Sequence, residues 1–307
     1  MLWVRIVRRV LLSAGILLGV TVIAFVLVRL APGNPAAAIL PTTATPAEVA
    51  AQEQRMGLDQ PILLQYFIYL GQLLHGDLGY SYMLNASNAS IILPRLANTA
   101  VITGIGVGLA LVVAIPLGVL AGMRPGSLRD STAVGFSLLG QAMSPVWLCL
   151  LMILVFSVWL KWLPPVTTSS ATSLIMPSVC VGFTFCSLVT RMLRAGTIEV
   201  LGQDYITAAR ARGIGRPRIY AMYALKNGLL PVLTISGAQI GILLGGSVVV
   251  EEIFQYPGVG ELTVQAISTR DLQLVQSIVV VAAVVMLLCN LVVDILNTVV
   301  DKRVKFN

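Results

Sequence analysis

The chain has 307 residues, of which 57% are hydrophobic and only 11% are charged. Soluble domains carry about 25% charged residues, so this composition excludes an ordinary soluble protein and indicates several membrane spans of roughly 20 residues each. The formal charge of +7 does not indicate nucleic-acid binding, because the sequence has no soluble basic domain to provide it; Lys and Arg also collect on the cytoplasmic loops of membrane proteins.

Six apolar segments are long enough to cross a hydrocarbon core of about 30 Å. We therefore expect an all-α, polytopic membrane protein in which residues 1–307 form a single transmembrane domain. The first segment is longer than the roughly 7–15 residues of a signal-peptide core, so we expect it to be retained as a span. The expected spans are approximately 10–30, 99–121, 134–159, 174–192, 229–250 and 274–300.

The distribution of basic residues predicts the orientation of these spans. Arginines at 5–9 precede the first span, seven basic residues gather between 191 and 226, and three follow the last span at 302–305. Cytoplasmic loops carry such an excess of Lys and Arg, so both termini and the loop 193–228 are expected in the cytoplasm.

With this orientation, two segments are expected on the side of the membrane opposite the cytoplasm. Residues 31–98 form a long insert, within which apolar and aromatic positions after Pro61 suggest a helix that is either interfacial or packed against protein. The second segment, 251–273, is acidic and rich in turn residues. It is interpreted either as a simple connector or as an external gate or contact surface for a soluble partner.

Within the spans, polar, small and helix-bending residues are the only candidates for a translocation path. Gly237, Gly241 and Gly245 have the spacing that allows close helix packing. For the end of this segment, at 245–247, a glycine-lined path for the substrate is the alternative interpretation. The candidate path or gate residues are Gln141, Met143, Ser144, Gln239, Gly245, Gly246, Ser247 and Glu251.

Recognisable catalytic and metal-binding patterns are missing from the sequence. The single histidine, His75, excludes a His-Glu-x-x-His zinc motif, and the lack of any Gly-Lys pair excludes a phosphate-binding loop. The four cysteines all fall in apolar runs, where free Cys behaves as a small hydrophobic residue. We expect no catalytic residues, no metal site and no cofactor in this chain, so energy from ATP would have to come from another polypeptide.

The segment 197–213 is the most informative part of the sequence. Apolar residues such as Ile206 alternate with charged ones at helical spacing, and Gly213 is a typical helix stop. A basic helix lying on anionic lipid is one interpretation; the small residues favour a tight fit into a protein groove. The candidate docking residues are Asp204, Tyr205, Thr207, Ala208, Ala209, Arg210, Arg212 and Gly213.

At these residues the chain resembles the membrane subunits of ATP-binding-cassette (ABC) importers, in the dipeptide, oligopeptide and nickel permease family. Thr207-Ala208-Ala209, three further residues and Gly213 match the cytoplasmic signature of that fold, although the first position is often Glu in the family and is Thr207 here. The likeness extends over most of the chain through short motifs at 31–35, 57–61, 76–79, 224–227, 245–247, 251–254, 257–260, 270–271 and 290–294.

The resemblance implies a type I importer permease fold and a bacterial cytoplasmic membrane location. It also implies that the signature helix seats in a groove of an ATPase subunit. The implied partners are a second homologous permease, two ATPase subunits that use ATP and Mg²⁺, and a soluble substrate-binding protein that touches 31–98 and 251–273.

The resulting expectation is a permease for import of di- or oligopeptides. Alternatives are an importer for nickel, a metal chelate or a glutathione-like ligand within the same family, and, in a different class, a secondary carrier. The scarcity of ionisable residues in the spans argues against a proton- or sodium-coupled carrier, and the missing catalytic set argues against a membrane enzyme.

Overall fold

The computed structural model describes residues 2–30, 45–55, 60–168 and 170–300. Contacts group the chain into two compact units, one formed by Met1–Ala97 with Glu261–Val285 and the other by Asn98–Gly260 with Met286–Asn307. The expected motif at 31–35, the first three residues of the motif at 57–61 and the basic residues at 302–305 lie outside the described residues. That all of 1–307 acts as one permease domain stays a prediction.

Most of the expected spans are present as long apolar helices. Among the described residues, five helical stretches are long and apolar enough to cross a membrane, and a bent helix pair raises the number to six if it counts as one span. Several helices run past their expected ends: the fourth expected span, 174–192, continues to Leu201. The additional helical turns contain polar residues, which is why the sequence alone places them in the loop 193–228.

The third expected span is not one straight helix. It consists of α6 (Leu128–Ala142) followed by Pro145–Trp159, and the two parts meet at an angle of 107°. Met143 and Ser144 between them have extended backbone, with ψ of 129° and 137°. Pro145 explains the break, because its ring disfavours a helical conformation in the residue before it and it has no N–H to continue the ladder.

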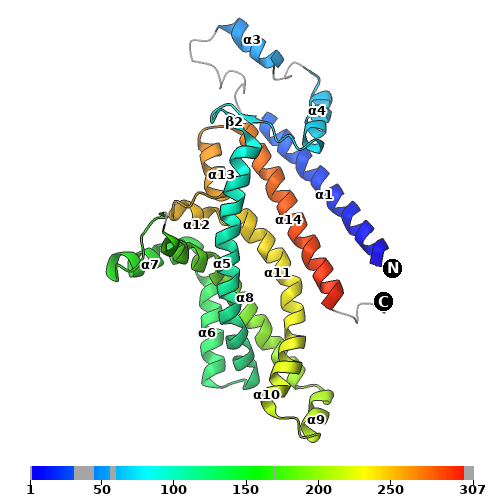
Figure 1. The fold of residues 1–307 in the computed structure, drawn as a ribbon, viewed down its shortest axis with the longest axis vertical. Coiled ribbons are helices and arrows are strands. Elements are labelled where there is room, and N and C mark those ends of the chain that lie inside the picture. The colour runs from blue at the N-terminus through cyan, green and yellow to red at the C-terminus, as the bar shows by residue number, and fades with distance from the viewer. Residues whose placement is uncertain (1, 31–44, 56–59, 169, 301–307) are drawn as a thin grey trace. The chain divides into compact units, whose positions relative to one another are not determined.

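The first unit holds the N-terminal span and the elements that follow it. Helix α4 packs on α1, as Figure 1 shows at the blue end of the chain. A short antiparallel hairpin pairs Tyr80 with Ser87 and Ser81 with Ala86. The elements of this unit are α1 (Leu2–Leu30), α3 (Pro46–Arg55), α4 (Ile62–Leu74), β1 (Tyr80–Ser81), β2 (Ala86–Ser87) and the start of α5 (Asn88–Met123), whose larger part belongs to the second unit. Most of α13 (Val259–Ser268) and the first half of α14 (Leu272–Val300) complete the unit.

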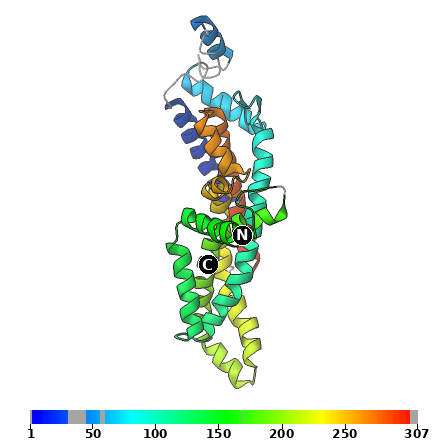
Figure 2. The ribbon, with the colours of Figure 1, turned by 90° about the vertical axis from the view of Figure 1, so that its left-hand side faces the viewer.

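The second unit is organised around α8 (Ile175–Leu201), against which α6 and α11 both pack (Figures 1 and 2). Its buried residues form apolar clusters, one of which contains Ala114, Phe185, Val189 and Leu193. The remaining elements are α7 (Pro145–Met152), a π-helix (Ile153–Trp159), a 3-10 helix (Ala171–Leu174), α9 (Asp204–Ala211), α10 (Arg216–Ile219), a second π-helix (Tyr220–Leu225), α11 (Lys226–Gly246) and α12 (Val248–Ile253).

Glycines bring α5 and α8 into close contact. A Cβ placed on Gly118 would lie 2.7 Å from the Cβ of Leu193, and one on Gly122 would lie 2.6 Å from that of Thr197. No larger residue fits at these positions unless the helices move apart. The Gly118/Gly122 spacing is therefore a packing motif, and it positions α8, whose C-terminal end leads into α9.

Candidate functional site

Helix α9 is a short, well-terminated helix. Asp204 lies in its first turn and Arg210 in its last turn, where each charge is stabilised by the helix dipole. At its end, the Gly213 N–H donates to the Arg210 carbonyl at 3.0 Å and the Ile214 N–H to the Ala209 carbonyl at 3.2 Å. Gly213 has a φ of +74°. This is a Schellman motif, which requires a left-handed residue at the Gly213 position.

One face of α9 is anchored to the rest of the second unit. Ile206 is fully buried and clusters with Val200 and Ile219, with Ile214 packed against them. Ala209 is also buried. The small size of Ala209 therefore serves packing within the chain, whereas the sequence suggested that it fits a partner's groove.

The opposite face of α9 is open. The exposed surface of α9 contains most of the candidate docking residues, including Tyr205, which is 43% exposed and whose ring lies 6.2 Å from that of Tyr223. The exposed candidates are Asp204, Tyr205, Thr207, Ala208, Arg210, Arg212 and Gly213. The structure thus brings these seven residues together on one rigid surface element.

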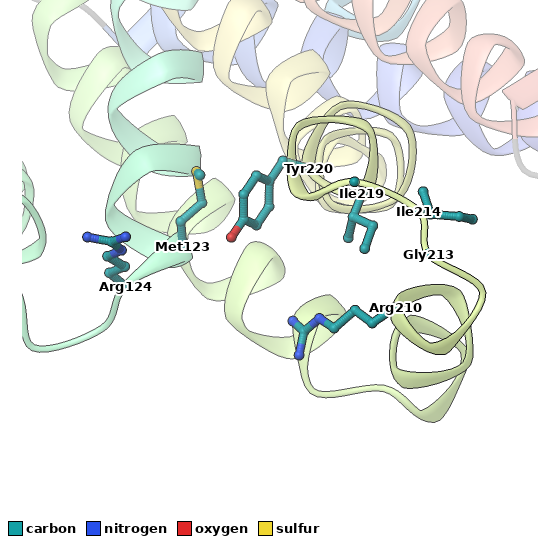
Figure 3. Close-up of a pocket in the computed structure, with 8 residues that line it drawn as sticks. Met123, Arg124, Arg210, Gly213, Ile214, Ile219 and Tyr220 are labelled. Atoms are coloured by element: carbon teal, nitrogen blue, oxygen red, sulfur yellow. The ribbon is translucent and has the colours of Figure 1, made fainter.

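A half-open cavity of about 530 Å³ adjoins α9. Figure 3 shows the ring of Tyr220 turned toward Met123, with Arg210 extending from α9. No pattern in the sequence predicts this cavity, because its walls come from three separate segments. The lining residues are Met123, Arg124, Arg210, Gly213, Ile214, Gly215, Ile219 and Tyr220.

An ion pair stabilises the helices above α9. The guanidinium of Arg194 on α8 contacts both carboxylate oxygens of Asp130 on α6, and the second of these bonds measures 2.9 Å. Asp130 also accepts a hydrogen bond from the Gly126 N–H at 2.8 Å. This arrangement ties the turn before α6 to the helix that leads into α9.

Glu251, a candidate gate residue, is fully buried. Its carboxylate accepts hydrogen bonds from Thr99 Oγ1 at 2.8 Å, Ser247 Oγ at 2.5 Å and the Gly260 N–H at 2.6 Å. A Cβ on Gly258 would collide with the same carboxylate. Glu251 therefore organises the turn 257–260 from within and does not line an open path in this structure.

The other candidate path residues are not assembled into one site. Ser247, at the break between α11 and α12, donates a hydrogen bond to Glu251. Gln141 accepts a hydrogen bond from Arg191 at 2.9 Å, and Met143 packs on an apolar cluster. Ser144 is exposed at the bend and Gln239 is half-buried in α11, while Gly245 and Gly246 end that helix. A translocation path through these residues stays a prediction.

Metal-binding side chains are dispersed over the described part of the chain, which holds no group of three or more His, Cys, Asp or Glu residues suited to a metal ion. Cys149, Cys180 and Cys186 are buried. They lie within apolar clusters, as expected for cysteines that act as small hydrophobic residues.

Comparison with known proteins identifies a family. Residues 114–306 match the model of the binding-protein-dependent transport system inner membrane component, and residues 1–103 match the model of the N-terminal part of such membrane components. The chain is 35% identical to the dipeptide transport system permease protein DppB of Alkalihalophilus pseudofirmus, over 97% of this chain and 98% of that protein. It is 36% identical to the oligopeptide transport system permease protein AppB of Bacillus subtilis, over 98% and 99%.

A solved structure confirms the fold. The chain resembles a chain of the MetNI methionine ABC transporter in an inward-facing conformation, with a TM-score of 0.57 over 69% of this chain and 97% of that chain. At 16% sequence identity, this likeness shows the fold alone. The fold is that of a type I ABC importer permease, as the sequence predicted.

Proposed function

The chain belongs to the family of binding-protein-dependent transport system inner membrane components, and we propose that it is the permease subunit of an ATP-driven importer of di- or oligopeptides. It is a multi-pass protein of the inner membrane. The names of its relatives, dipeptide and oligopeptide permeases, support peptides as the substrate class. The basic loops support the proposed orientation, with both termini in the cytoplasm.

The observation that carries the proposal is the two-sided construction of α9. Ile206 and Ala209 fix one face to the chain, and Tyr205, Thr207 and Ala208 are exposed around the rest of the helix. A short helix held rigidly between two spans can transmit a displacement of a bound partner to the spans. In this proposal the partner is an ATPase subunit, and the exposed face of α9 seats in its surface.

Two ATPase subunits would use ATP and Mg²⁺, and a second permease of the same fold would complete the pathway. A soluble binding protein would deliver the peptide at 31–98 and 251–273. Switching between outward and inward states requires that ATP and the loaded binding protein each bind one state more tightly than the other. The ion pair of Asp130 with Arg194 supports such coupling, because it makes α6 and α8 move together beside α9.

The docking step is tested by placing a charge on the exposed face of α9. We expect Ala208→Asp to reduce co-purification of the ATPase subunits at least about tenfold, the effect of about 1.4 kcal/mol, because a carboxylate desolvated without a partner is costly. The matched control is Ala50→Asp on the exposed surface of α3, which should leave the complex intact. Normal co-purification of Ala208→Asp would refute docking through α9.

A further inference from the structure

Helix α4 has an unusual distribution of polar residues. Its thirteen residues include no charged side chain. Gln65, Tyr66 and Tyr69 recur at the three- and four-residue spacing that places them on one side of a helix. A helix on a protein surface in water normally turns its polar side outward.

In α4 the polar side faces inward, toward α1. Gln65 is buried and accepts a hydrogen bond from Arg29 Nε at 3.0 Å. The hydroxyls of Tyr66 and Thr21 lie 3.1 Å apart. The ring of Phe25 packs edge-on against Tyr66 and stacks with Tyr69, with ring centroids 5.3 Å and 5.9 Å apart. These contacts bury most of the hydrogen-bonding capacity of α4.

The outward side of α4 is apolar, and of the polar side chains of the helix only Gln72, at the edge of this side, is exposed. Leu63 is 75% exposed, Phe67 64% and Leu74 81%. Leu64 and Ile68 extend the same surface, which we call the outer face of α4. Leaving such a surface in water would cost about 25 cal/mol for each Å² of apolar area, so something apolar has to cover it.

The position of α4 along α1 indicates what that cover is. Helix α1 contains a candidate span, Leu11–Leu30, of which only 17% is buried. Its contacts with α4 run from Arg29 back to Thr21, which lies about 14 Å from Leu30 at 1.5 Å per residue. One leaflet of the hydrocarbon core is about 15 Å thick, so the side chains of α4 contact α1 over most of the depth of one leaflet.

We propose that α4 is embedded in the membrane leaflet at the Leu30 end of α1, with lipid acyl chains covering its outer face. The outer face of α4 then continues the lipid-facing surface of α1. Gln65 and Tyr66 of the inward polar side are hydrogen-bonded to α1. Arg29, whose guanidinium lies 3.6 Å above the Phe25 ring, is at the level where long basic side chains reach the membrane surface. Naming this leaflet the outer one rests on the proposed function; the embedding does not.

The experiment places nitroxide spin labels on single cysteines at Leu63 and Phe67, in a variant whose four native cysteines are replaced. The assembled complex is reconstituted in phosphatidylethanolamine–phosphatidylglycerol vesicles, and collision rates with oxygen and with a water-soluble nickel chelate are measured. The control label is placed at Glu48, which is exposed on the polar helix α3. ATP hydrolysis by the same samples reports on assembly separately, so a failed importer proposal and a failed embedding give different results.

We expect the ratio of oxygen to nickel collisions to be several-fold higher at Leu63 and Phe67 than at Glu48. A ratio as low as that at Glu48 would place α4 in water and overturn the proposal. Low collision rates with both reagents would show that protein covers the outer face, for example a second permease or the binding protein, and would overturn it as well. A label at Leu74 repeats the measurement on the same face if one of the first two variants does not assemble.

Discussion

The hydroxyl of Thr99 donates a hydrogen bond to the buried carboxylate of Glu251 across 2.8 Å and accepts one from the Val259 N–H at 2.9 Å. One side chain of α5 thus connects the buried Glu251 side chain to the turn 257–260. The Glu251 carboxylate also binds Ser247 at the break between α11 and α12, so one hydrogen-bond network links this break, α5 and the turn 257–260.

Replacing Glu251 by Gln should destabilise the second unit. The amide places a donor where the carboxylate accepts a hydrogen bond from the Gly260 N–H or a hydroxyl, and an unsatisfied buried donor costs about 1–3 kcal/mol. Thermal unfolding of the purified complex measures the effect. Glu252→Gln is the control, since Glu252 is exposed; equal stability of the two variants would show that the network contributes nothing.

The ion pair of Asp130 with Arg194 predicts coupled mutational effects. Asp130→Asn and Arg194→Gln should each lower the free energy of unfolding, because each leaves the partner in a partly buried site without its counter-charge. The double variant should lose less unfolding free energy than the two single variants together, and the difference, the coupling energy, should be about 0.5–3 kcal/mol. Strictly additive effects in denaturant titrations would argue that the pair is not an energetic unit.

Substitutions at two neighbouring residues of α9, one buried and one exposed, should affect stability differently. Ile206→Ala removes a fully buried side chain and should destabilise the second unit by about 2–5 kcal/mol. Thr207→Ala, on the exposed side, should leave the unfolding temperature unchanged. Hydrogen exchange over 200–212 would detect the loss of protection in the first variant only, and equal protection in both would contradict the anchored orientation of α9.

Tyr256 predicts a loss of stability at alkaline pH. Burial, reinforced by the Glu251 carboxylate, raises the pKa of its phenol, and its hydroxyl donates to the Asn98 carbonyl at 2.9 Å. The pKa of Tyr256 is higher in the folded protein than in the unfolded chain, where it is about 10. Its contribution to the free energy of unfolding is therefore fully present below about pH 10 and is lost as the pH rises through the pKa of the folded state.

The corresponding measurement is the unfolding temperature of the wild type, Tyr256→Phe and the exposed Tyr82→Phe from neutral to alkaline pH. Tyr256→Phe should start about 1 kcal/mol less stable because it lacks the hydrogen bond, and should then decline less steeply. Parallel curves for all three proteins would show that Tyr256 does not titrate with unfolding.

The length of the apolar segments predicted most of the spans, because a segment of about 20 apolar residues has few alternatives to crossing a membrane. Gly213 correctly predicted the end of α9, since its left-handed backbone is a local requirement. The bend at Pro145 had a local signal, but its size of 107° depends on packing.

The roles of individual polar residues were less accessible from the sequence. Glu251 and Thr99 are separated by 152 positions and Asp130 and Arg194 by 64, and no periodic pattern predicts such pairs. From the sequence alone, an acidic residue at the end of a span can equally be a gate residue or a buried structural residue. The two are distinguished only when its hydrogen-bond donors are known. Ala208 and Ala209 likewise look equivalent in sequence, and only the packing of Ile219 and Val200 distinguishes the buried from the exposed one.

Substrate-dependent ATP hydrolysis tests the proposed importer most directly. The chain would be reconstituted with its second permease, both ATPase subunits and the binding protein, and hydrolysis and uptake would be followed with dipeptides, oligopeptides and nickel chelates. We predict that peptides stimulate both activities and that Ala208→Asp abolishes the stimulation. Stimulation by nickel chelates alone would contradict the peptide assignment, and peptide uptake that proceeds without ATP would contradict the importer mechanism itself.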